Sequence, residues 1–174
     1  MTRIDIPTLR TDRLVLRSFR ADDLDAYAAM QANPEVMRYL GTGQPRSRSE
    51  SWDAMARVIG QWGLRGYGQF ALEDVASGRL VGRAGILHPL DWEGPELAYG
   101  LDQPFWGQGF ATEACTALHR WAFSVLGLPS LVSYILPANT RSRRVLVKLG
   151  ATRGPDALLF GTITAECWHH QPGA

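Results

Sequence analysis

The first candidate for chemistry is a glycine loop between an expected strand and a long expected helix. The strand covers 96–101, Gly107-Gln108-Gly109 follows, and the helix covers 110–126. The first turn of a helix offers unpaired N–H groups and the positive end of the helix dipole, and glycine lets the backbone approach a ligand closely. The pattern fits a phosphate-binding loop or a plain turn. It lacks the Lys-Ser/Thr of a Walker A loop and the third glycine of a dinucleotide fingerprint.

A second group of residues turns polar side chains toward the interior at a helix start. Helical spacing puts Asn139, Ser142 and Leu149 on one face, so the face that buries Leu149 also carries two polar side chains inward. Buried polar groups need hydrogen-bond partners. The partners are either the local backbone, with Asn139 as the helix cap, or a bound ligand.

Strands and helices along the whole chain are needed to position these residues. Alternating hydrophobic residues predict strands, and hydrophobic residues spaced by three and four predict helices. The helix over 110–126 has the clearest pattern, with Ala111, Leu118 and Val125 on its inner face. The expected strands are 13–20, 67–75, 80–87, 96–101, 131–136 and two within 157–168; the other expected helices begin at 21, after Ser47 or Ser49, and at 139.

The order of these elements predicts an α+β fold. We expect one domain over 1–174, with a mixed, mostly antiparallel sheet of about seven strands and about four helices on its faces. A length of 174 residues fits a single domain with one core. The first helix is expected to end where Asn33-Pro34 interrupts it.

Composition argues against several classes of protein. The 18 Lys and Arg against 17 Asp and Glu leave a net charge of +1, which disfavours a dedicated nucleic-acid binder. Cys115 and Cys167 are too few for a disulfide framework, and neither they nor the four histidines are spaced as metal ligands. Residues 1–14 contain no apolar signal segment, and no hydrophobic run is long enough to cross a membrane. We therefore expect a cytoplasmic protein without a metal.

Four motifs in order resemble the GNAT superfamily of N-acetyltransferases, and more narrowly its ribosomal-protein N-acetyltransferase-like branch. Any one motif alone would be weak, whereas four in the correct order along nearly the whole chain are specific. The resemblance implies a GNAT fold in which strands 96–101 and 131–136 splay apart. The motifs are Thr11-x-Arg13-Leu14-x-Leu16-Arg17, the segment 33–40, the segment 96–114 with Trp106-Gly-Gln-Gly-Phe-Ala-Thr, and the segment 139–150.

The resemblance also implies acetyl-CoA as cosubstrate. Its pyrophosphate would lie on the backbone amides of 106–112, its pantetheine between the two splayed strands, and its thioester carbonyl near the N–H of Leu101, which would stabilise the developing oxyanion. The residues expected to bind the cofactor are Tyr99, Leu101, Trp106, Gly107, Gln108, Gly109, Phe110, Ala111, Thr112, Asn139, Ser142 and Arg144.

Departures from the superfamily pattern refine these expectations. Gln108 stands where Lys or Arg is frequent, so the loop binds phosphate chiefly through its backbone. Leu146 occupies the position where many members place a tyrosine general acid, which makes Ser142 the candidate to protonate the leaving thiolate. In the basic cluster on the same helix, Arg143 or Arg144 is expected near the 3′-phosphate, unless the cluster is simply a solvated face.

An amine nucleophile arrives protonated, so a base must remove its proton. Glu96 is the first candidate, because strand alternation puts it on one face with Ala98 and Gly100. The alternative is a solvated carboxylate at the strand end. Glu166 and Asp156 are the other candidates for the base.

The residues and the resemblance together predict an N-acetyltransferase. We expect direct transfer from acetyl-CoA to an amine in a ternary complex; the acceptor is either a protein N-terminal amine or a small molecule, in contact with Tyr39 and the 39–45 loop. The alternative is a non-catalytic acyl-CoA-binding regulatory module, which the missing tyrosine favours. The expected fold is compatible with a homodimer, and the near-neutral charge gives no sign of a strong field on the acceptor side.

Overall fold

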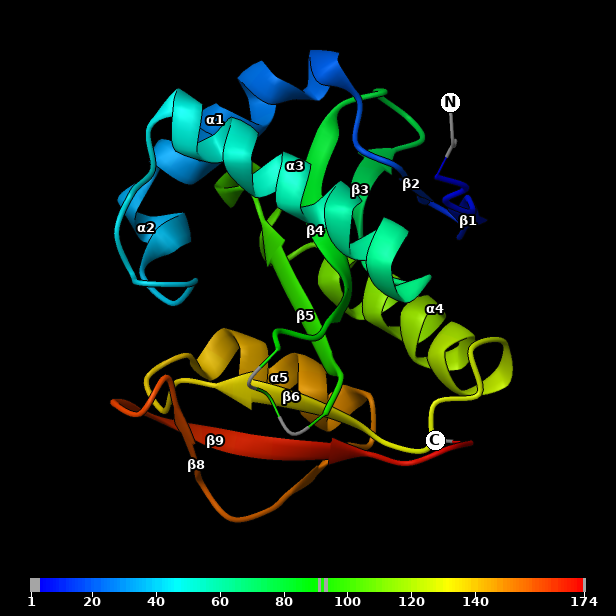
Figure 1. The fold of residues 1–174 in the computed structure, drawn as a ribbon, viewed down its shortest axis with the longest axis vertical. Coiled ribbons are helices and arrows are strands. Elements are labelled where there is room, and N and C mark those ends of the chain that lie inside the picture. The colour runs from blue at the N-terminus through cyan, green and yellow to red at the C-terminus, as the bar shows by residue number, and fades with distance from the viewer. Residues whose placement is uncertain (1–3, 91, 93, 174) are drawn as a thin grey trace.

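A twisted sheet runs through the molecule and carries helices on both faces (Figure 1). The computed structural model describes residues 4–90, 92 and 94–173. The strand order is β1-β2-β3-β4-β5-β6-β9-β7, and β8 pairs with β9 outside this path. The strands are β1 (Leu9–Arg10), β2 (Leu14–Arg17), β3 (Gln69–Asp74), β4 (Leu80–Leu87), β5 (Glu96–Leu101), β6 (Leu131–Ile135), β7 (Thr152–Arg153), β8 (Ala157–Leu159) and β9 (Ile163–His170).

The helices divide between the two faces of the sheet. Helix α3 crosses in front of it in Figure 1 and shares a buried cluster with α1, whereas α4 and α5 lie on the opposite face. Among the described residues no helix is both long and apolar enough to cross a membrane. The helices are η1 (Ala21–Asp23), α1 (Leu24–Ala32), α2 (Pro34–Met37), α3 (Arg48–Arg65), η2 (Gln103–Phe105), α4 (Phe110–Ser124) and α5 (Thr140–Lys148).

The sheet opens between β5 and β6. These strands form the parallel pair of the sheet and are in register at one position, Glu96 opposite Val132. The pairs β2–β3, β3–β4, β4–β5 and β6–β9 are antiparallel. The mixed, mostly antiparallel sheet and its splay are therefore confirmed, and the two strands diverge beyond Glu96 into a V.

Hydrophobic packing holds a layer of helices on each face. On the α4 face, Leu118 and Ala114 pack against Leu97 and Ile86 of the sheet, and all four are fully or almost fully buried. On the other face, Tyr27 and Met30 of α1 belong to a second buried cluster. Burial of one such large side chain contributes about 1.5–3 kcal/mol, so the two cores fix both helical layers, and with them the ends of β5 and α4.

The structure corrects the expectations around the first helices. The first long strand is shorter than expected, covering 14–17 rather than 13–20. The Asn33-Pro34 break ends α1 but also begins α2, because the Asn33 side chain accepts a hydrogen bond from the Glu35 N–H and Pro34 fits the first turn of a helix. Helix α2 lies beside the site described below, so this break has a positioning role.

The later elements agree with the sequence except at their ends. Helix α4 ends at Ser124, and Val125, expected on the inner face, is 70% exposed. The described residues contain nine strands rather than about seven and five α-helices rather than about four. The two additional short strands, β1 and β7, have two residues each, which is too short for an alternating pattern to predict.

A buried ion pair fastens the start of α1 to the sheet. Arg17 of β2 donates from Nη1 and Nη2 to the two Asp23 carboxylate oxygens at 2.7 and 2.8 Å, and from Nε to Glu73 of β3 at 2.7 Å. The Arg17 and Asp23 side chains are each 7% exposed. Burial alone would raise the pKa of Asp23, but hydrogen bonds from Arg17 and the Arg20 N–H outweigh it and lower that pKa.

Candidate active site

A cavity of about 580 Å³ lies where the end of β5 meets the starts of α4 and α5, with α2 and the residues after it on a further side. Of the residues predicted to bind the cofactor or the acceptor, all except Gln108 line it. Those residues are Tyr39, Tyr99, Leu101, Trp106, Gly107, Gly109, Phe110, Ala111, Thr112, Asn139, Ser142 and Arg144. The chain thus brings two segments, 99–112 and 139–144, to the walls of one cavity.

Two glycines of the loop between β5 and α4, Gly107 and Gly109, line this cavity and can present only backbone to it. Gly107 has φ +74° and Gly109, the N-cap of α4, has φ +85°, both in the region that favours glycine. A Cβ at Gly107 would meet nothing within 4 Å, so the loop leaves open space at this point. The Gln108 side chain folds back to donate to the Pro104 carbonyl at 2.7 Å. An anion here would meet the amides at the start of a 15-residue helix.

Arg13 and Glu113 hold this loop in place through an ion pair and hydrogen bonds, an arrangement called the brace below. Arg13 donates from Nε to Glu113 at 2.7 Å and from Nη1 to the Gln108 carbonyl at 2.9 Å. Thr11 donates to the same Glu113 carboxylate at 2.6 Å. Sequence reasoning did not assign these residues a role, although Thr11-x-Arg13 belongs to one of the motifs that carry the family resemblance. The brace fixes the loop before any ligand binds, which lowers the entropic cost of binding.

Replacing Gly109 with alanine is expected to weaken acetyl-CoA binding about tenfold, equivalent to about 1.4 kcal/mol. Alanine at this position would have to adopt the left-handed backbone conformation of Gly109, which a Cβ makes unfavourable, and that Cβ would lie 3.3 Å from Nη2 of Arg13. Gly66→Ala is the matched control, because Gly66 also has a positive φ but lies at the end of α3. Isothermal titration measures both; equal affinity in the two variants would contradict a binding role for this loop.

Helix α5 supplies the opposite wall. The Asn139 side chain accepts from the Ser142 N–H at 3.2 Å and so caps α5, as one of the two interpretations of the sequence predicts, while also lining the cavity. Tyr99 of β5 donates its hydroxyl to the Ser142 carbonyl at 3.1 Å across the opening. Burial raises the pKa of Tyr99, so its hydroxyl stays protonated and available as a donor. Leu146 is fully buried and does not line the cavity.

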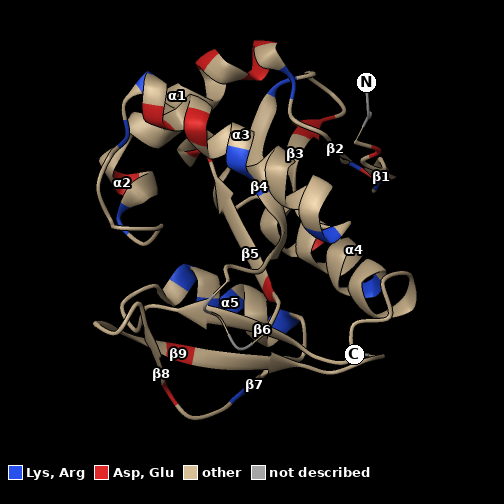
Figure 2. Ribbon diagram, viewed as in Figure 1, with Lys and Arg blue, Asp and Glu red and all other residues tan. Residues whose placement is uncertain are grey.

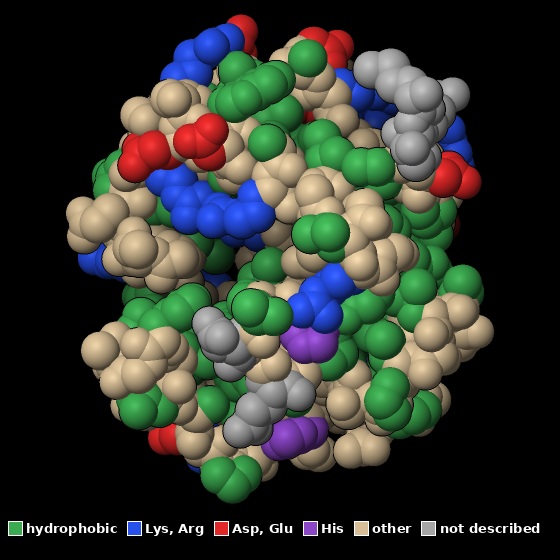
Figure 3. All heavy atoms as spheres, in the orientation of Figure 1, with side chains coloured by type: hydrophobic (Ala, Val, Ile, Leu, Met, Phe, Trp, Pro, Cys, Tyr) green, Lys and Arg blue, Asp and Glu red, His purple; other side chains and the backbone are tan. Residues whose placement is uncertain are grey.

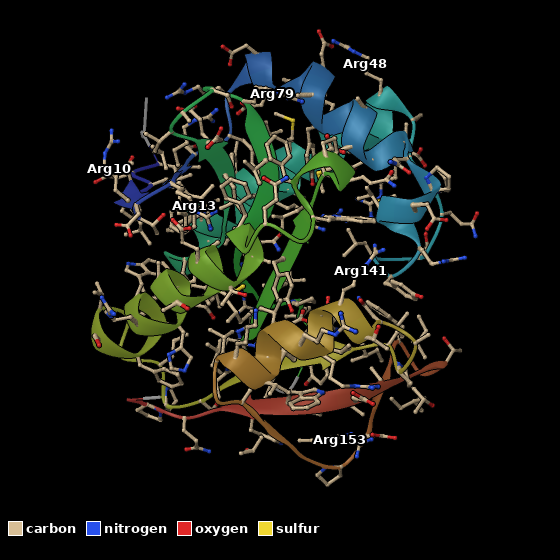
Figure 4. The ribbon with its side chains drawn as sticks, turned by 180° about the vertical axis from the view of Figure 1, so that it is seen from behind. Arg10, Arg13, Arg48, Arg79, Arg141 and Arg153 are labelled. Atoms are coloured by element: carbon tan, nitrogen blue, oxygen red, sulfur yellow. The ribbon has the colours of Figure 1, made fainter. Side chains whose placement is uncertain are left out.

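The basic cluster on α5 separates into different roles. Figure 2 shows α5 marked by Lys and Arg. Arg143 donates to both Glu166 carboxylate oxygens, at 2.8 and 3.2 Å, whereas Arg144 lines the cavity. The guanidinium of Arg141, labelled in Figure 4 in the gap above α5, lies 4.5 Å from the Trp106 ring centroid and so links α5 to the loop. Of the two arginines that the sequence left open for the 3′-phosphate, Arg144 is the one at the cavity.

Glu96 lies at the apex of the V between β5 and β6. Its carboxylate accepts a hydrogen bond from the Tyr134 N–H of β6 at 3.3 Å, just beyond the one residue pair that joins the strands. The residue is 7% exposed, so it is not the solvated strand-end carboxylate of the alternative interpretation. Burial raises the pKa of Glu96 to about 7, against smaller lowering contributions from the Tyr134 N–H and the charge of Arg83. A carboxyl with this pKa can accept and release a proton near neutral pH.

The other candidates for the base are held in ion pairs. Glu166 accepts from Arg143 and from the Trp168 indole N–H, and these bonds overcome burial and lower its pKa. Asp156 pairs with Arg153. None of the three candidates, Glu96 included, lines the 580 Å³ cavity. Within the described residues there is also no cluster of three or more His, Cys, Asp or Glu that could hold a metal ion.

A V between two central strands and a glycine loop at the start of a long helix form a site suited to a phosphorylated ligand that lies between the strands. The chain belongs to the GNAT acetyltransferase family, because the model of the acetyltransferase (GNAT) domain matches residues 13–152. The fold, with its α+β architecture and mostly antiparallel sheet, is the GNAT fold.

Three relatives show the breadth of this similarity. The uncharacterized N-acetyltransferase p20 of Bacillus licheniformis is 30% identical over 145 residues, covering 82% of this chain and 80% of that protein. The crystal structure of an acetyltransferase from Agrobacterium tumefaciens str. C58 has a TM-score of 0.85 and 32% identity, covering 98% of each chain. The [ribosomal protein uS5]-alanine N-acetyltransferase of Escherichia coli (strain K12) is 28% identical over 159 residues, covering 85% of this chain and 80% of that protein. The relatives therefore include a ribosomal-protein N-acetyltransferase.

Proposed function

We propose that this GNAT acetyltransferase, as one domain spanning the chain, transfers the acetyl group of acetyl-CoA directly to an amine within a ternary complex. The observation that carries the proposal is the cavity between the β5–α4 loop and α5, which lies at the open side of the β5–β6 V. Glu96, the candidate base, lies at the apex of that V and is not among the residues that line the cavity. The cosubstrate supplies the thioester. The cavity supports this fit, because it joins an anion-binding helix start to the opening between the strands.

Binding is assigned to the two walls of the cavity. The amides of 106–112 would hold the pyrophosphate, with Arg144 available to a further phosphate. Tyr99, Leu101 and Asn139 line the stretch between the loop and the opening of the sheet, where the pantetheine would lie. Tyr39, half-buried on the α2 side of the same cavity, would contact the acceptor.

The chemistry is assigned to Glu96 and Ser142. The acceptor ammonium loses a proton to the Glu96 carboxylate, directly or through a water molecule, and the free amine attacks the thioester carbon. The new C–N bond forms and the C–S bond breaks. The nitrogen gives up its second proton, and Ser142 at the start of α5 relays that proton to the departing thiolate or hydrogen-bonds the thiolate. The N–H near Leu101 stabilises the oxyanion that forms between these steps.

The experiment that tests this proposal combines binding and turnover. Isothermal titration with acetyl-CoA is expected to show saturable binding, and thiol release from acetyl-CoA is expected in the presence of an amine panel of amino acids, polyamines, aminoglycosides and N-terminal peptides. Tight binding with no thiol release from any amine would favour a non-catalytic acyl-CoA-binding module. No binding at high micromolar acetyl-CoA would overturn the proposal.

A further inference from the structure

The face of the sheet opposite α4 carries polar side chains where a hydrophobic lining would be expected. Gln69 of β3, Arg83 of β4 and Glu96 of β5 share this face, because the register places Gln69 opposite Gly85 and Arg83 opposite Gly100. Gln69 is 4% exposed and Arg83 is half-buried. Burying such polar groups costs free energy unless each of them has a hydrogen-bond partner.

The hydrogen bonds of Arg83 leave one edge of its guanidinium open. Nη1 donates to Oε1 of Gln69 at 2.6 Å. Nε of Arg83 and Nε2 of Gln69 are both buried, and neither has a hydrogen-bond partner among the described residues. Since a guanidinium binds carboxylates through two adjacent N–H groups, the Nε edge of Arg83 is left unpaired, although neither Arg83 nor Gln69 is among the residues that line the 580 Å³ cavity. Gln69 then offers a further donor beside it.

The surroundings of Arg83 are positively charged. Within the described residues, Arg46, Arg57 and Arg83 form no ion pair with a carboxylate; burial, followed by the charges of Arg83 and Arg57, lowers the pKa of Arg46. Glu96 is near enough for the charge of Arg83 to affect its pKa but makes no ion pair with it. Figure 3 shows Lys and Arg side chains over α3 along the rim of a hollow that opens beside α2. These arginines are spread over residues 46–83 of the sequence, so the positive electrostatic potential that they create together is apparent only in the folded structure.

Arg83 adjoins the cavity through a residue without a side chain. Gly100, opposite Arg83 on β5, lines the cavity together with Leu40. A Cβ at Gly100 would lie 2.8 Å from Cδ1 of Leu40, so α1, α2 and the following loop close over the sheet at this point. An acceptor that reaches Arg83 from the cavity must therefore displace Leu40 or pass beside it, which favours a small molecule over a folded protein surface.

We infer that the acetyl acceptor is a small amine that also carries a carboxylate, bound by the free edge of Arg83 and by Gln69, an inference that rests on the acetyl transfer proposed above. The acceptor's carboxylate would lie at Arg83, opposite Gly100, and its amine would point toward the thioester near Leu101, the next residue of β5. Arg83 would then be a specificity residue, since it selects the acceptor without taking part in proton transfer.

The test compares amines that differ only in the carboxylate. Thiol release from acetyl-CoA is measured with each standard amino acid, β-alanine and 4-aminobutyrate, and with their carboxamides. For the preferred acid we expect kcat/KM at least about tenfold above that of its amide, since a lost charge-assisted pair of hydrogen bonds is worth at least 1.4 kcal/mol. Arg83→Met is expected to bring acid and amide within about threefold of each other and to leave acetyl-CoA affinity by isothermal titration unchanged. Arg120→Met, an exposed arginine on α4, is the matched control and keeps the wild-type preference.

The outcomes separate this inference from the function on which it rests. Acetyl-CoA binding with equal or better turnover of the amides, or of peptides regardless of their charge, would overturn the inference and leave the acetyltransferase proposal standing. So would a preference for the acid that survives Arg83→Met, or thiol release with none of the carboxylate-bearing amines. Absence of acetyl-CoA binding would overturn both. The wild-type comparison of acid and amide decides the matter even if Arg83→Met does not fold.

Discussion

Glu96→Gln is expected to lower kcat/KM about 100-fold at pH 8, a loss of about 2.7 kcal/mol of transition-state stabilisation. The glutamine side chain has the same shape and can still accept a hydrogen bond from the Tyr134 N–H, which the carboxylate accepts at 3.3 Å. It cannot take a proton from the acceptor ammonium. The loss therefore reports the chemistry of the carboxyl at the apex of the V rather than its packing.

The effect of Glu96→Gln on kcat/KM is expected to depend on pH, because only the ionised carboxylate can act as the base. Burial raises the pKa of Glu96 to about 7, so the base is ionised above pH 7 and protonated below it. The ratio of wild-type to variant kcat/KM is expected to be large and constant above about pH 8 and to shrink about tenfold for each pH unit below 7. Using the ratio cancels the ionisation of the amine itself. A variant that keeps full kcat/KM, or a ratio without this bend, would remove Glu96 from the mechanism.

Stability measurements distinguish this effect from unfolding. Because the folded-state pKa of Glu96 is raised above its ordinary value of 4.5, its stabilising contribution is complete below pH 4.5 and is lost as the pH rises through 7. The wild type is expected to lose this contribution at pH 8, whereas Glu96→Gln has no ionisation to lose. Asp53→Asn, an exposed position on α3, serves as the control and retains wild-type kcat/KM.

Asp23→Asn is expected to lower the free energy of unfolding by about 3 kcal/mol at pH 7, because it leaves the buried Arg17 guanidinium without its bidentate partner. Glu73 still accepts from Arg17, which keeps the loss at the lower end of the range for broken buried pairs. The lowered pKa of Asp23 stabilises the fold above its ordinary value of 3.8, and this stabilisation disappears as the pH falls through the folded-state value. The difference between the two proteins is therefore expected to shrink in acid.

The matched control lies two residues further along the chain. Asp25 pairs with Arg48 at 2.8 Å, but their side chains are 85% and 66% exposed. Exposed pairs contribute about 0–1 kcal/mol, so Asp25→Asn is expected to change stability little. Urea denaturation at pH 7 measures both variants. Equal losses in Asp23→Asn and Asp25→Asn would show that burial of the Arg17–Asp23 pair does not fasten α1 to the sheet.

The sequence predicts the order and type of the long elements, because each has enough residues for a period to appear. Helix α4 shows this best: its buried stripe includes Ala114, Leu118 and Ala122, and only its last expected member, Val125, is exposed. Strands β1 and β7 and helix α2 are too short for a period. The Asn33-Pro34 pair is typical both of the end of a helix and of the start of the next one. The spacing of hydrophobic residues does not show that it serves as both here.

The parts of the site that are continuous in sequence were predictable. Contacts that depend on the pairing of strands or on distant segments coming together were not. The 106–112 loop and the start of α5 stand out as motifs, and the structure places both at one cavity. The contact of Arg83 with Gln69 depends on the pairing of β3 with β4, and the brace of Arg13 joins residues about 100 positions apart. The burial of Glu96, which turns an ordinary carboxyl into a candidate base, likewise follows from the splay and has no local sequence signal.

Initial-rate kinetics with both substrates varied test the central claim most directly. If the amine attacks the thioester while both molecules occupy the opening between β5 and β6, double-reciprocal plots of thiol release at several fixed amine concentrations must intersect. Parallel lines, together with an acetylated enzyme that mass spectrometry detects after incubation with acetyl-CoA alone, would show a covalent intermediate instead. That result would contradict direct transfer and the roles assigned here to Glu96 and Ser142.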